Sequence, residues 1–186
     1  RLDPNLPRGL AVEKLFRTNL QSAGNFDFVV STRIDKSTEE RPHFFIVYGT
    51  KDRKGLITFR QTEYEALRVH AKSRADAKER KREAKTGLGD LFAGLRGEFG
   101  ADDIDEIIEE QKQRATQDLL DTLPLYGPFK FSDVVVGLLQ AYMLRETNVK
   151  DICVELAKAG RILNTWGGGN RKPREDHLIQ LTPGAP

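Results

Sequence analysis

Residues 147–174, TNVKDICVELAKAGRILNTWGGGNRKPR, decide the fold of the last third of this 186-residue chain. Apolar residues recur there at the i, i+3, i+4, i+7 spacing of an amphipathic helix: Val149, Ile152, Cys153 and Leu156. Thr147 or Asn148 is expected to cap this helix, and Gly160 to end it in the left-handed conformation. A strand at 161–166 and a basic, glycine-rich loop at 167–174 are expected to follow.

The flanking segments complete the pattern of a winged helix. An earlier helix, capped by Ser132, is indicated by one apolar stripe: Phe131, Val135, Leu138, Leu139 and Tyr142. Residues 129–131 are a short strand or a lead-in to that helix, and residues 177–181 are a strand that closes a hairpin. An acidic helix at 102–123 supplies the third helix in front. The order of helices, strands and basic loop therefore predicts a winged-helix module.

The sequence leaves the partner of this module open. Five residues are expected on the outward face of its last helix: Asn148, Lys150, Asp151, Glu155 and Lys158. Two of these are acids, which phosphate would repel, whereas the basic loop could follow a nucleic-acid backbone. The candidate nucleic-acid-binding residues are Lys150, Lys158, Arg171, Lys172, Arg174, Arg80 and Arg82. Contact with a protein partner and a purely structural role remain alternatives, because fold does not decide function.

The first half of the chain indicates a mixed helical and stranded region. A helix is expected at 10–22, with apolar residues Val12, Leu15, Phe16 and Leu20. Strands at 26–31 and 43–49 are expected to pair as an antiparallel hairpin, and the apolar second strand to be covered on both faces. A long helix then runs to residue 85, with a basic second half that includes Arg80 and Arg82. This basic helix either pairs with the acidic helix at 102–123 or contacts nucleic acid.

The chain is expected to have three parts. Residues 1–86 form a helix–strand–strand–long helix region, 87–101 a glycine-rich linker, and 102–186 a helical segment and winged-helix domain. The predicted fold class is α+β. An alternative for residues 1–86 is the C-terminal part of an α/β, Rossmann-like sheet. The opening residues, from Arg1, look like an interior loop, so we expect the chain to belong to a longer polypeptide.

The composition excludes several classes of site. Charged residues are 31% of the chain but the net charge is +2, so any nucleic-acid signal must come from local patches. One cysteine, Cys153, excludes an internal disulfide and Cys-rich zinc sites. The three histidines have no metal-ligand spacing, and we identify no catalytic, cofactor-binding or metal-binding residue. Apolar runs are too short to span a membrane and no signal peptide is visible, so a cytoplasmic protein is expected.

Residues 10–85 carry FDFVVSTRI at 26–34, RPHFFIVYGTK at 41–51 and then Lys54-Gly55-Leu56. In these motifs the segment resembles the closing part of the three-Cys-motif partner proteins of bacteria. Those proteins are similar to class I, S-adenosylmethionine-dependent methyltransferases, and some have a C-terminal extension that resembles a winged helix. The resemblance implies a methyltransferase-like fold and a protein partner of the three-Cys-motif kind.

The same resemblance implies no catalytic or cofactor residue in this chain. The glycine-rich turn, the ribose-binding acid and the catalytic residues of that family have no counterpart here, so S-adenosylmethionine would be held by a longer parent protein. Whether the protein is an enzyme therefore stays open. The expected function is a non-catalytic C-terminal region whose winged helix binds nucleic acid or a protein partner. The alternatives are a stand-alone α+β protein-interaction adaptor and a winged-helix DNA-binding regulator.

Overall fold

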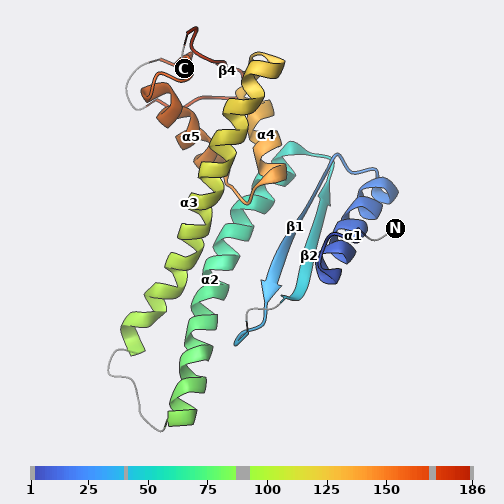
Figure 1. Ribbon diagram of the computed structural model, residues 1–186, viewed down its shortest axis with the longest axis vertical. Coiled ribbons are helices and arrows are strands. Elements are labelled where there is room, and N and C mark those ends of the chain that lie inside the picture. Colours follow the sequence, from blue (N-terminus) through green and yellow to red (C-terminus); the bar gives the residue numbers. More distant parts are fainter. Residues whose placement is uncertain (1–2, 40–41, 87–92, 168–170, 185–186) are drawn as a thin grey trace. The chain divides into compact units, whose positions relative to one another are not determined.

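The computed structural model describes residues 3–39, 42–86, 93–167 and 171–184 (Figure 1). The chain divides into two compact units, Arg1–Glu106 and Ile107–Pro186, called here the N-terminal and the C-terminal unit. Helix α3 (Ala93–Tyr126) contributes to both. The structure is a mixture of helices and two small antiparallel sheets, which agrees with the predicted α+β class.

The N-terminal unit has the predicted order of helix, two strands and long helix. These are α1 (Arg8–Gly24), β1 (Phe28–Asp35), β2 (Pro42–Thr50) and α2 (Arg53–Thr86). The two strands form the predicted antiparallel hairpin, in which Val30 lies opposite Tyr48. Helix α1 extends beyond the predicted range of 10–22 at both ends, and it ends where Asn25 takes the left-handed conformation, with φ 48°.

Helices α1 and α2 pack on opposite faces of the hairpin. Ser31 donates a hydrogen bond to Glu13 of α1, whereas its neighbour Thr32 donates to Glu63 of α2. Successive side chains of a strand point to opposite faces, so these two bonds assign one helix to each face. On the α2 side, the rings of Tyr48 and Phe59 stack with their centroids 4.7 Å apart.

Two expectations about burial in this unit are wrong for the described residues. Strand β2 is not covered on both faces, since Phe44 and Ile46 are 48% and 46% exposed. Helix α1 does not bury its whole apolar stripe either, because Val12 is 49% and Phe16 55% exposed. Helices α1 and α2 thus cover the faces of this two-stranded sheet only in part, and every residue of β2 is at least partly exposed.

The C-terminal unit continues from α3 through β3 (Phe129–Lys130), α4 (Phe131–Ala141), α5 (Glu146–Lys158) and β4 (Leu178–Ile179). Phe129 pairs with Ile179 across β3 and β4. Farther along, Leu181 forms a bridge with Ile162. Residues 129–131 are thus both a short strand and the start of a helix.

The strands of this unit are shorter than predicted. Of residues 161–166, only Ile162 forms a bridge, because Asn164 accepts a hydrogen bond from the Trp166 amide at 3.2 Å and turns the chain. Thr165 still donates to the carbonyl of Leu178 at 2.8 Å, so the segment stays beside β4.

The predicted N-cap positions of this unit are wrong, although Asn148 does cap helix α5 from a position inside it. Helix α4 begins at Phe131, with Lys130 and not Ser132 before its first turn. Helix α5 begins at Glu146; Asn148 lies inside it and accepts a hydrogen bond from the Arg145 amide at 2.9 Å. The predicted end at Gly160, with φ +70°, is confirmed.

Helix α3 is longer than predicted at both ends. It begins at Ala93, earlier than the predicted Asp102, and continues past Pro124 to Tyr126. Of the predicted linker, residues 87–92 lie outside the described residues and the remainder is helical. The two compact units divide within α3, between Glu106 and Ile107.

The C-terminal unit has an apolar core to which the predicted stripes of its two short helices contribute, although Tyr142 of the first stripe is only half-buried. Its most buried side chains include Phe131, Leu139, Leu144, Val149, Ile152, Cys153, Ile162 and Ile179. Among the described residues, none of the helices combines the length and apolar character required to cross a bilayer.

Candidate functional site

Helix α5 presents less positive charge than its sequence indicates. Asn148, predicted to face outward, is only 7% exposed because its side chain caps the helix from within. Lys150 forms an ion pair with Glu146 at 2.6 Å along the same helix. Lys158 is exposed near the helix end.

The two acids on the outward face of α5 are paired within the protein. Lys172 of the basic loop lies 2.5 Å from Asp151, and Lys112 of α3 lies 3.8 Å from Glu155. These pairs reduce the repulsion expected between α5 and phosphate. They also engage Lys172, one of the loop cations predicted to bind a nucleic-acid backbone.

The basic loop keeps two exposed arginines, Arg171 and Arg174. Arg171 folds back over Gly167, where an added Cβ would lie 3.4 Å from a guanidinium nitrogen. Pro173, almost fully buried, anchors the loop between them. The two exposed arginines of the loop therefore lie on either side of a buried proline.

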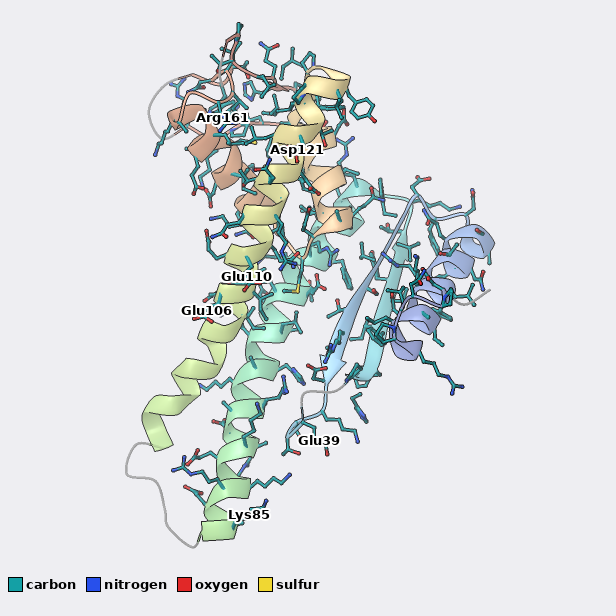
Figure 2. All side chains as sticks on the ribbon, viewed as in Figure 1. Glu39, Lys85, Glu106, Glu110, Asp121 and Arg161 are labelled. Carbon is teal, nitrogen blue, oxygen red and sulfur yellow. The ribbon has the colours of Figure 1, made fainter. Side chains whose placement is uncertain are left out.

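Arg80 and Arg82 are exposed on α2 and belong to the N-terminal unit. The candidate residues are thus divided between the two units and do not form one site within either. The acidic residues of α3, such as Glu106 and Glu110, are also exposed (Figure 2). One contact of the expected pairing between the basic and acidic helices is present, because Arg68 lies 3.7 Å from Asp105.

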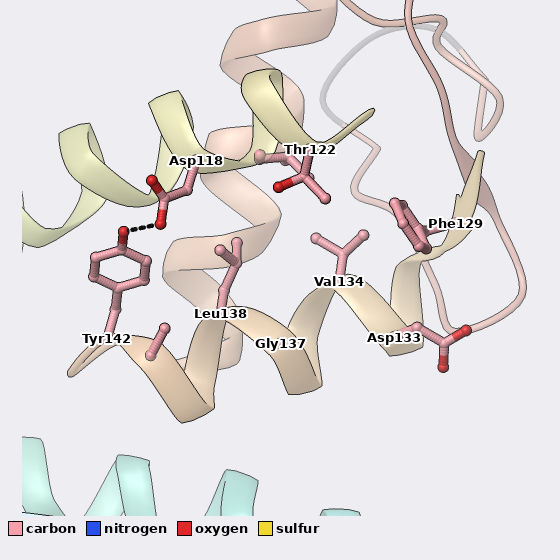
Figure 3. A pocket seen from close by; sticks show the side chains of 10 residues that line it. Asp118, Thr122, Phe129, Asp133, Val134, Gly137, Leu138 and Tyr142 are labelled. Carbon is pink, nitrogen blue, oxygen red and sulfur yellow. Dashed lines mark hydrogen bonds between the residues drawn. The ribbon is translucent and has the colours of Figure 1, made fainter. Parts of the chain in front are cut away.

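The C-terminal unit has a cleft of about 300 Å³ between α3 and α4. Figure 3 shows Asp118 and Tyr142 at one end, and Phe129 and Asp133 at the other. The walls between them are mostly apolar, and the full lining is Asp118, Leu119, Thr122, Phe129, Asp133, Val134, Gly137, Leu138, Ala141 and Tyr142. None of these lining residues comes from α5 or the basic loop.

Gly137 leaves space over the middle of α4. A Cβ added to it would meet no atom within 4 Å, so no close packing within the described structure requires a glycine here. Glycine inside a helix costs about 1 kcal/mol relative to alanine. A glycine within the predicted helix is the sequence signal that could have identified this site, and it was not among the candidate residues predicted above.

Exposed apolar side chains continue the cleft along α3. Leu125 and Tyr126 are 74% and 73% exposed. They follow the lining residue Thr122 by three and four positions, which places them on the same face of the helix. The apolar surface therefore extends beyond the cleft, which favours a polypeptide over a small molecule as its ligand.

Tyr142 closes one end of the cleft by donating a hydrogen bond from its hydroxyl to Asp118. This bond, followed by burial, raises the pKa of Tyr142 from 10.0 to about 12. The neutral phenol is therefore favoured in the folded protein. Its contribution to stability is complete below pH 10 and is lost as the pH rises toward 12.

We expect Asp118→Asn to lower the pKa of Tyr142 from about 12 back toward 10, because the amide accepts a weaker hydrogen bond than the carboxylate and carries no charge. Alkaline titration of tyrosinate absorbance would measure the change. Subtracting the curve of Tyr142→Phe isolates this residue from the other three tyrosines. An unchanged titration in Asp118→Asn would show that the two side chains do not interact.

Cys153 does not supply a nucleophile. Its side chain is 0% exposed on the apolar face of α5, and burial raises the pKa of its thiol to about 12. The thiolate, which is the reactive form, is therefore scarce near neutral pH. Among the described residues, no group of three or more His, Cys, Asp and Glu is arranged to hold a metal ion.

No family model, curated protein or solved structure matches this chain.

Proposed function

We propose that the C-terminal unit is a winged-helix module that binds a protein partner through the cleft between α3 and α4. The winged-helix assignment rests on the order α3, β3, α4, α5, bridged residue Ile162, basic loop and β4. It rests also on the pairing, in which the β4 segment contacts both β3 and Ile162. This order and this pairing support the winged-helix assignment.

The observation that carries the binding proposal is the apolar cleft with exposed Leu125 and Tyr126 beside it. Exposed apolar surface around a concavity is typical of sites that bind another polypeptide. The face of α5 supports the proposal indirectly. Its ion pairs leave it close to neutral, so it offers phosphate little attraction.

Selection from a library of displayed random peptides tests the proposal. We expect peptides that bind the unmodified chain to lose about tenfold or more in affinity for Gly137→Leu, because the leucine fills the cleft where bound side chains would lie. Leucine favours helix and its Cβ would meet no atom within 4 Å at this position, so the variant should fold. The matched control is Arg171→Glu with Arg174→Glu, which should leave peptide binding unchanged.

Failure to enrich any peptide would overturn the proposal, as would peptides that bind Gly137→Leu undiminished. The second candidate function, binding of a nucleic-acid backbone, is favoured by the exposed Arg171, Arg174 and Lys158. A duplex DNA titration at two salt concentrations separates it from the first. Binding that falls steeply with salt, and that the double arginine reversal weakens, would favour nucleic acid.

For the N-terminal unit we propose a methyltransferase-like origin, as its resemblance to the three-Cys-motif partner proteins implies. The observation in favour is that β2, the most apolar segment of the unit, exposes Phe44 and Ile46. Such a strand is typical of the interior of a larger sheet. The reading frame upstream of Arg1 tests this: a glycine-rich turn between a strand and a helix would support it, and a start codon near Arg1 would contradict it.

A further inference from the structure

We infer that the segment held by the α3–α4 cleft is a basic amphipathic helix of another protein. The inference rests on the proposed function and names the chemistry of the partner. It follows from the charge of the lining, the shape of the cleft and the composition of this chain.

The charge of the cleft selects a basic partner. Of the ten described residues that line it, two are carboxylates, Asp118 and Asp133, and none is a cation. Asp121 of α3 is a further exposed acid near the cleft. It accepts a hydrogen bond from the side-chain amide of Gln117 at 2.8 Å. An apolar segment with cations at its ends would pair with the carboxylates, whereas an acidic one would be repelled.

The length of the cleft matches about two turns of a helix. The carboxylates occupy its two ends, beside positions 133 and 142 of the chain (Figure 3). Nine residues at 1.5 Å each separate those positions, which is roughly 13 Å along α4. Two turns of a partner helix span about 11 Å, and the length of flexible lysine side chains makes up for the shorter span.

These dimensions define the partner by spacing. Cations at i and i+7 of the partner helix would meet Asp118 and Asp133. Apolar residues at i+3 and i+4 lie on the same face and would enter the space over Gly137. Leu125 and Tyr126 of α3 would cover the side of the bound helix.

The basic stretch of this chain does not fit that description. Residues 72–85, KSRADAKERKREAK, contain many cations, but alanine is the largest apolar side chain among them. They have nothing to fill a cleft of about 300 Å³. This stretch is therefore excluded as the occupant of the cleft.

Three end-capped, fluorescein-labelled helical peptides test the inference by anisotropy. All carry Leu at i+3 and i+4, and they differ only in having Lys, Gln or Glu at i and i+7. We expect the Lys peptide to bind about three- to tenfold more tightly than the Gln peptide, and the Glu peptide to bind most weakly. The advantage of Lys should shrink as salt is added, because the carboxylates are near the surface.

Two variants of the full chain assign the effect to the cleft. Asp118→Asn with Asp133→Asn should abolish the preference for Lys over Gln. Glu175→Gln with Asp176→Asn changes the net charge equally at exposed positions outside the cleft lining, and should preserve that preference. Trp166 fluorescence and helix content would show that both variants are folded.

The outcomes separate this inference from the proposed function. Equal binding of the Lys and Gln peptides would overturn the basic partner while leaving the cleft a protein-binding site. Selection of extended peptides would contradict the inferred helical partner, and selection of acidic peptides would contradict its inferred basic charge. Either result would still leave the cleft a protein-binding site. Enrichment of no peptide at all would overturn the proposed function together with the inference.

Discussion

Replacing Glu63 by alanine is expected to lower the free energy of unfolding of the N-terminal unit by about 3 to 5 kcal/mol. Glu63 lies between Thr32 of β1, which donates a hydrogen bond to it, and Arg60, whose guanidinium is 2.6 Å away. The side chain of Arg60 is 5% exposed and that of Glu63 is 2% exposed. Alanine would leave the charge of Arg60 buried without its carboxylate, and a buried charge is costly.

Hydrogen exchange measured on peptides of β1 and α2 would follow this unit by itself. Glu65→Ala is the matched control, because Glu65 is exposed on the same helix and should change the free energy by no more than about 0.5 kcal/mol. Replacing both partners, Arg60→Met with Glu63→Leu, should recover most of the loss. A loss in Glu63→Ala no larger than in Glu65→Ala would show that the pair is not buried.

The spacing of residues along α2 contained a signal for this buried pair. Leu56, Arg60, Glu63 and Leu67 follow one another by four, three and four positions, so they share one face of the helix. In a chain that is 31% charged, an arginine and a glutamate are ordinarily assigned to the surface. The spacing indicates the shared face, but it does not indicate the contact with Thr32, which the hairpin brings to that face and which donates a hydrogen bond to Glu63.

The helices of the C-terminal unit could be predicted because each buries one continuous stripe. The spacing of Val149, Ile152, Cys153 and Leu156 is sufficient to identify α5, and all four are buried. Polar residues were less predictable. Asn148 looked like an outward residue or a first cap, yet its side chain bonds back to the Arg145 amide and is buried by that contact.

The boundaries of α3 and the cleft could not be predicted for different reasons. Pro124 normally ends a helix, but in the last turn it removes only one hydrogen bond and the helix continues to Tyr126. The cleft lies between two helices, and local sequence patterns do not predict how closely two helices pack. Gly137, a poor helix former inside α4, is the residue whose type could have pointed to this cleft.

Phe131→Ala is expected to lower the free energy of unfolding of the C-terminal unit by about 3 to 5 kcal/mol. Phe131 is the first residue of α4 and is 1% exposed. Its amide donates to the carbonyl of His177 at 2.8 Å, which links α4 to the segment before β4. Alanine keeps this backbone bond and favours helix, so the loss would come from the buried ring and the cavity it leaves.

Fluorescence of Trp166, the only tryptophan in the chain, would follow unfolding of this unit, since its side chain is 6% exposed within it. Leu125→Ala is the control, because Leu125 is 74% exposed and should change the free energy by no more than about 0.5 kcal/mol. Equal midpoints for the two variants would contradict the described core around α4. The same probe applied to Glu63→Ala has a second use: a Trp166 transition that does not move would show that the two units unfold independently.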